Sequence, residues 1–172
     1  MKTRAAGPKP PGLGSRWPGL TTLSYGGTAA IVTGMGLVVA FDAGTSSRAA
    51  LVSSLLVVAI ADNLADSLAI HVYQESENLP SKRAFRSTVA NYLTRLMVAS
   101  SFAILALVTP AHSLVPVVLV WGMALLCTLT YFVARGRGVA PGLEVLKHVA
   151  VAILVIVVSR AIGAWIVARA SA

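Results

Sequence analysis

Cysteine and acidic residues are scarce in this chain, and several catalytic motifs are missing from it. Cys127 is the single cysteine among 172 residues, so a disulfide within the chain and a cysteine-based metal cluster are both excluded. Asp and Glu number six, against fourteen Lys and Arg. The sequence also lacks a Gly-x-Ser-x-Gly elbow, a His-Glu-x-x-His pair and a phosphate-binding glycine loop. We therefore do not expect an enzyme.

Long apolar runs take up most of the chain, which is 56% hydrophobic and 12% charged. A transmembrane helix needs roughly 20 mostly apolar residues. Five runs satisfy this length: 22–41, 49–72, 87–108, 114–134 and 144–167. We expect an all-α integral membrane protein with five transmembrane helices, in which residues 1–20 form a disordered basic tail and residues 21–172 form one membrane domain. The first run exceeds the apolar region of a secretory signal, which is about 7 to 15 residues long.

The basic residues are distributed unevenly between the two ends of the expected helices. Arg48 and Arg169 lie at one end. By the positive-inside rule, the opposite end, with the N-terminus, is cytoplasmic and the C-terminus is outside, as in a multi-pass protein of the cytoplasmic membrane. Cations in such loops indicate anionic lipid headgroups as partners and not nucleic acid. The cytoplasmic set is Lys2, Arg4, Lys9, Arg16, Lys82, Arg83, Arg86, Arg135, Arg137 and Lys147.

Two acids interrupt the second apolar run, in the stretch ADNLADSLAIH at residues 61–71. Asp62 and Asp66 are four residues apart and share one face of the expected helix. A second polar stripe, about 100° away around the helix, consists of Asn63, Ser67 and His71. Toward the expected cytoplasmic end the chain continues with Glu75 and Glu77. The polar side of this helix therefore runs from mid-membrane to the cytoplasmic face.

An ionised aspartate at this depth costs on the order of 2.5 to 3.5 kcal/mol, so it needs a partner or a function. In one interpretation, Asp62 and Asp66 bind a cation or relay protons, because hard cations take oxygen ligands and imidazole suits transition metals. Auxiliary ligands would then be Asn63, Ser67 and His71, with Glu75 and Glu77 at the cytoplasmic mouth. In the other, Arg95 neutralises one aspartate, because its depth of roughly 12 Å lies between those of Asp66 and Asp62.

Two stretches of this sequence resemble the vacuolar iron transporter family. YGGTAAIVTG at residues 25–34 is similar to the family pattern Tyr-Gly-x-Asn-Asp-Gly-x-Val-Thr-Thr, with agreement at Tyr25, Gly26, Val32 and Thr33. IADNLADSLAI at residues 60–70 is similar to the segment Leu-Ala-Asn-Leu-Leu-Ala-Asp-Gly-Ile-Ser-Met, with agreement at Ala61, Leu64, Ala65 and Asp66. The resemblance implies a five-helix homodimer that moves Fe²⁺ or Mn²⁺ out of the cytosol, with no permanently bound cofactor.

The departures from the family pattern concern its ion path. Ala29 stands where the family has an aspartate, and Ile70 stands where it has a methionine. A cytoplasmic metal-binding domain is replaced by the short connection 73–86. Two alternatives follow: the metal site has moved to Asp62, Asp66 and His71, or a structural or regulatory membrane protein keeps the fold with its aspartates paired to Arg95.

Overall fold

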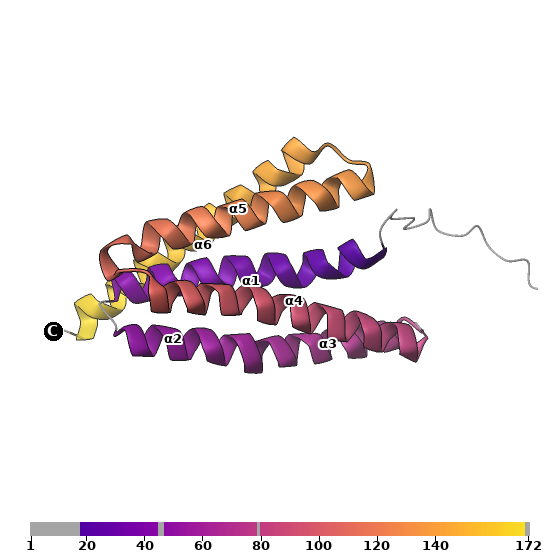
Figure 1. Cartoon of the computed structure of the whole chain (residues 1–172), viewed down its shortest axis with the longest axis horizontal. Helices are drawn as coiled ribbons and strands as arrows, with labels where there is room; N and C mark the ends of the chain where they lie inside the picture. Colours follow the sequence, from indigo (N-terminus) through magenta and orange to yellow (C-terminus); the bar gives the residue numbers. More distant parts are fainter. Residues whose placement is uncertain (1–17, 45–46, 79, 171–172) are drawn as a thin grey trace, which may run out of the picture.

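The computed structural model describes residues 18–44, 47–78 and 80–170, which are helical almost throughout and contain no β-strand (Figure 1). Five of its helices are long and apolar enough to cross a membrane, so the prediction of an all-α, multi-pass membrane protein is confirmed. One span consists of three consecutive segments that continue one another, α2, η1 and α3. The elements are α1 (Pro18–Ala43), α2 (Arg48–Val57), the π-helix η1 (Val58–Asp62), α3 (Asn63–Ser76), α4 (Ser81–Val108), α5 (Ala111–Arg137) and α6 (Pro141–Ala170).

The observed helices contain the expected ones and continue beyond them. The predicted connection 73–86 is wrong, because α3 continues to Ser76 and α4 begins at Ser81. A count of apolar residues finds only the part of a helix inside the hydrocarbon, whereas the backbone hydrogen bonding continues past the apolar run at one or both ends. Of the expected tail at residues 1–20, the last three form the start of α1 and the others lie outside the described residues.

Proline, serine and glycine mark the helix ends. Pro80 and Pro110 directly precede α4 and α5, and Pro141 is the first residue of α6. Proline suits these positions because the first turn of a helix leaves its N–H groups unpaired in any case. Gly138 ends α5 with φ 71°, the left-handed conformation that glycine adopts without strain. The Ser47 hydroxyl accepts a hydrogen bond from the Ala50 N–H at the start of α2.

Helix α1 is central, with α5 and α6 on one side and α4 on the other (Figure 1). The α2–η1–α3 span packs mainly on α4 and forms the outer layer. Glycines permit these close approaches: Gly26 faces Asn91 of α4, Gly34 faces the Phe102 ring, and Gly163 of α6 faces the backbone of Ala40. Gly26 and Gly34, which are eight residues apart on α1, are therefore used for packing within the chain.

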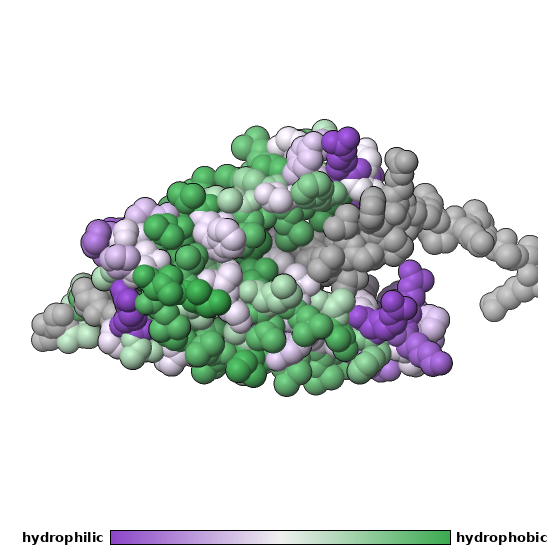
Figure 2. Space-filling view, in the orientation of Figure 1, coloured by the Kyte–Doolittle hydropathy of each residue, from purple (hydrophilic) through white to green (hydrophobic). Residues whose placement is uncertain are grey.

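Apolar side chains form both the core and most of the outer surface. The core lies between α1, α4 and α5 and includes Met35, Val38, Phe102 and Leu126. Figure 2 shows apolar residues along the length of the molecule and hydrophilic residues toward its ends. The α3–α4 and α5–α6 connections lie at the same end of the molecule as the start of α1 (Figure 1), so the two basic connections share one end.

Candidate functional site: a cluster of aspartates and arginine between α3 and α4

The acidic stretch begins inside a π-helix. The N–H of Asn63 is shared between the carbonyls of Ile60 and Val58, three and five residues earlier, and does not bond that of Ala59 as in an α-helix. The side chain of Asn63 compensates, because its Nδ2 donates to the Ala59 carbonyl over 2.9 Å. Asn63 is 1% exposed and directs its remaining polar atom, Oδ1, toward α4. The bulge thus holds one amide side chain in a fixed position between the two helices.

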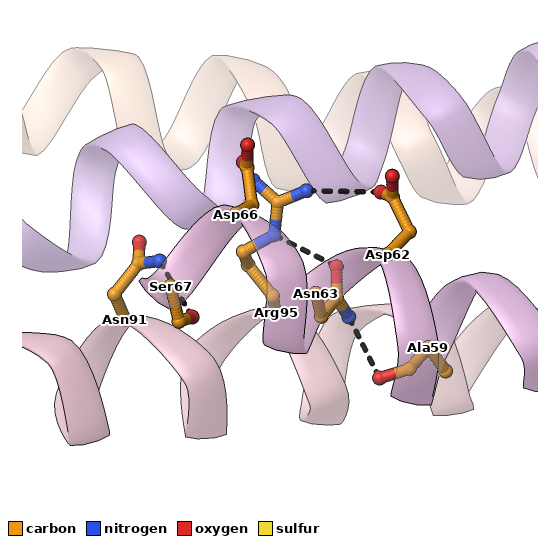
Figure 3. A network of polar contacts seen from close by, with 7 residues as sticks. All are labelled: Ala59, Asp62, Asn63, Asp66, Ser67, Asn91 and Arg95. Atoms are coloured by element: carbon orange, nitrogen blue, oxygen red, sulfur yellow. Dashed lines mark hydrogen bonds and ion pairs between the residues drawn. The ribbon is translucent and has the colours of Figure 1, made fainter. Parts of the chain in front are cut away.

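Arg95 is the centre of the cluster (Figure 3). It projects from α4 and is 3% exposed. Its Nε donates to Asn63 Oδ1 over 2.7 Å, one terminal nitrogen contacts the Asp66 carboxylate, and the other lies 3.4 Å from Asp62 Oδ2. The sequence interpretation paired Arg95 with one aspartate and left the other over, whereas the structure brings both carboxylates to the same guanidinium.

The charges in this cluster do not balance. Two carboxylates share one guanidinium, which leaves a formal charge of −1 when both are ionised. The Arg95 side chain is 4% exposed, but those of Asp62 and Asp66 are 59% and 42% exposed. Both acids therefore reach the outer surface of the η1–α3 segment, where their neighbours Leu64 and Leu68 are also exposed. A carboxylate on an otherwise apolar membrane surface requires water, a cation or another polar surface against it.

Further polar contacts continue from the cluster along α3 and α4. The Asn91 side chain donates to Ser67 Oγ over 3.2 Å, Thr88 Oγ1 lies 3.3 Å from Nδ1 of His71, and Gln74 donates to Ser87 Oγ over 2.9 Å. Together these contacts form a polar seam that ends near the α3–α4 connection. Of its α4 side the sequence predicted only Arg95, although the spacing of about four residues could also have revealed the others: Ser87, Thr88 and Asn91.

The remaining predicted site residues are placed as follows. His71 Nε2 lies 3.4 Å from the Glu75 carboxylate, and His71 contacts Thr88 and not the two aspartates. Glu77 is exposed just beyond the end of α3. Within the described part of the chain, no three His, Cys, Asp or Glu side chains come together in a way that could hold a metal ion. The set Asp62, Asp66 and His71 expected from the sequence is therefore not assembled within one copy of the chain.

Helix α1 packs directly against the cluster at Gly26. A Cβ at Gly26 would overlap Oδ1 of Asn91 and lie 2.8 Å from Cγ of Arg95. Asn91 is 1% exposed, and its Oδ1 accepts no hydrogen bond from the described residues. Only glycine leaves room for these two side chains to lie against the α1 backbone.

Comparisons with protein-family models, with curated proteins and with solved structures each found no match. Fold and site together define the chain as a multi-pass, all-α membrane protein that carries a shared aspartate–arginine cluster within its apolar region. The resemblance to vacuolar iron transporters rests on residues 25–34 and 60–70 alone.

Proposed function

We propose that this protein is a cation transporter in which Asp62 and Asp66 bind the transported ion. The observation that carries the proposal is the charge excess of the cluster, where two carboxylates share the single guanidinium of Arg95. A purely structural ion pair needs one acid for one base, and a second acid in the membrane is costly. An excess negative charge is what a site for a cation or a proton requires.

In this mechanism Arg95 acts as an internal counter-ion. While the site is empty, the guanidinium neutralises part of the charge of both aspartates. An arriving Fe²⁺ or Mn²⁺ ion, or a proton, competes with Arg95 for their oxygens, since carboxylates are ligands for such cations. The bond from Arg95 Nε to Asn63 is to a neutral group, so it can hold the arginine in place while the carboxylates change partner. Exchange of metal ions for protons would follow from the same competition.

The seam between α3 and α4 provides a polar route toward the site. It leads from Ser67 past His71 to Glu75 and ends near the exposed Glu77. Both basic connections lie at this end of the molecule, which supports a cytoplasmic location for it in the cell membrane and an outside location for the C-terminus. Glu75 and Glu77 would then collect cations on the cytoplasmic side, and transport would run out of the cytosol.

A second copy of the chain is the partner that we propose for the exposed face of α3. This face carries the half-exposed carboxylates beside large exposed apolar residues. Pairing two copies there would remove Asp62 and Asp66 from lipid and bring four carboxylates together. That arrangement would supply more ligands than one chain assembles alone.

Flux measurements on purified protein in liposomes test transport. We expect Fe²⁺ or Mn²⁺ flux in the wild type that changes with an imposed proton gradient. Asp62→Asn and Asp66→Asn should each abolish most of it at matched protein content. Asp42→Asn is the matched control, because Asp42 is an exposed acid near the end of α1, outside the cluster. Absence of flux from well-folded wild type, or equal flux in all variants, would contradict the proposal.

A non-transporting structural or regulatory protein is the second candidate. The nearly complete burial of Arg95 and its bond to Asn63 support it, because such a network holds α3 and α4 in register whether or not an ion passes. In this case the aspartate variants change the folded yield and no metal moves. Yield and flux measured on the same preparations therefore separate the two candidates.

A further inference from the structure

A cavity of about 570 Å³ lies between α1, α5 and α6. None of the residues of the aspartate–arginine cluster lines it. Its volume is in the range of ligand pockets, roughly 300 to 1,000 Å³. Most of the wall is apolar and includes Ala29, Val32, Leu129, Val133 and Val151. A ligand in this cavity must therefore bury apolar groups.

One buried polar group in the wall lacks a partner. Thr130 of α5 lines the cavity and is 6% exposed, and its Oγ1 has no hydrogen-bond partner among the described residues. A hydroxyl buried in this way costs free energy, typically about 1 to 3 kcal/mol. Because the oxygen itself is buried, the Thr130 side chain must turn toward the cavity to donate to an acceptor of a ligand, and that bond would remove this cost.

The charged residues of the wall come from the end of α5 and the start of α6. Glu144 is neutralised, since Lys147 Nζ lies 2.9 Å from its carboxylate. The Arg137 guanidinium makes no hydrogen bond to a residue that the structure describes, although its charge also acts on the Glu144 carboxylate. His148 donates from Nδ1 to the Glu144 carbonyl over 2.7 Å, so its Nε2 is an acceptor while the imidazole is neutral. Arg137 is thus the cation that remains for an anionic ligand.

We propose that this cavity binds an anionic glycerophospholipid. Its phosphate pairs with Arg137, an ester carbonyl accepts a hydrogen bond from Thr130, and an acyl chain lies along the apolar wall. Arg137 and Thr130 are seven residues apart on α5, about 10 Å along the helix, and the long arginine side chain can shorten this distance. The apolar wall within a membrane-spanning region favours a lipid over a soluble anion.

Native mass spectrometry of the full-length protein in detergent tests the site. The probes are phosphatidylglycerol and phosphatidylcholine with identical acyl chains. We expect the wild type to retain phosphatidylglycerol preferentially, and Arg137→Gln to weaken its binding about tenfold, as for loss of one charged hydrogen bond. Arg135→Gln is the matched control, because Arg135 lies on the same helix but outside the cavity wall. Equal retention of both lipids, or equal losses in the two variants, would overturn the proposal.

Two further variants and one soluble probe separate the parts of the site. Thr130→Val should weaken both lipids by a similar factor, since both carry ester carbonyls, and Arg137→Lys should keep the preference for phosphatidylglycerol. Thr130→Val binding both lipids as tightly as wild type would overturn the role of the hydroxyl. Glycerol phosphate, which has no acyl chain, should bind far more weakly than phosphatidylglycerol. Equal affinity would show a site for a soluble anion and would overturn the assignment to lipid.

Discussion

Arg95 donates from Nε to Oδ1 of Asn63 over 2.7 Å, which joins α4 to the residue that follows the π-helix. Asn63 is neutral, so this bond does not depend on the charge of either aspartate. The two terminal nitrogens of Arg95 are directed to the carboxylates. One contact of Arg95, to Asn63, therefore fixes its position, and separate contacts pair its charge with the two aspartates.

The imbalance of charge predicts unequal costs for removing its members. Arg95→Gln leaves two carboxylates without a base and should lower stability by about 2 to 3 kcal/mol, since breaking such a pair is costly but these acids are partly exposed. Asp66→Asn leaves Arg95 with Asp62 and should cost about 1 kcal/mol. The double variant should recover part of the loss caused by Arg95→Gln. Thermal midpoints in detergent, followed by tryptophan fluorescence, check this order, and a larger loss for Asp66→Asn would contradict it.

Gly26 should not tolerate even one added methyl group. Gly26→Ala places a Cβ against Asn91 and Arg95, which cannot move without breaking their own contacts. We expect a loss of about 1 to 3 kcal/mol. Gly142→Ala is the control, because a Cβ at Gly142 would meet nothing within 4 Å. Equal thermal midpoints for the two variants would show that α1 does not press on the cluster.

Arg48 should stabilise the end of α4 that is remote from the basic connections. Its guanidinium donates to the carbonyls of Leu107 and Thr109 over 3.1 and 2.7 Å. These carbonyls lie at the C-terminal end of α4, where a cation also interacts favourably with the helix dipole. Arg48→Gln should lower stability by about 1 kcal/mol. The exposed Arg83, at the opposite end, provides the control Arg83→Gln, whose thermal midpoint should stay at the wild-type value.

Thr130→Val should not destabilise the lipid-free protein. The Thr130 hydroxyl has no partner among the described residues, so replacing it with a methyl group of similar size removes an unsatisfied group and breaks no contact. We expect an unchanged midpoint or a gain of up to about 1 kcal/mol. A loss measured after removal of lipid would mean that the hydroxyl already has a partner in the protein.

Length and hydropathy alone predict the five spans, because a bilayer of fixed thickness demands long apolar helices. The contact between Arg95 and the aspartates could also be predicted, since helical rise places Arg95 between Asp62 and Asp66 in depth. Its double contact was not, because the rotation of α4 relative to α3 depends on side-chain packing. A polar residue of α4 does not by itself indicate the seam, because its partner lies on another helix.

The π-helix at Val58–Asp62 could not have been predicted in this way. VAIAD contains neither proline nor glycine, the two residues that most disfavour an α-helix, so nothing in it marks a departure from one. The bulge brings the Asn63 side chain to Arg95, a partner 32 residues away in sequence. The predicted ligand set of Asp62, Asp66 and His71 does not come together within one copy of the chain for a related reason. Helical periodicity placed His71 on the same side as the aspartates, but Thr88 of α4 and Glu75 of its own helix are its actual partners.

The shared cluster has a consequence for how the chain enters the membrane. The span Arg48–Ser76 contains Asp62 and Asp66, and their base is on the next span, Ser81–Val108. The charges of each span remain unpaired until the other span has entered the translocon, and the connection between the two spans is only a few residues long. During synthesis the two should leave the translocon together as a helical hairpin. Insertion assays on chains ending after Ser76 and after Val108 should show the second span retained efficiently only when the third accompanies it.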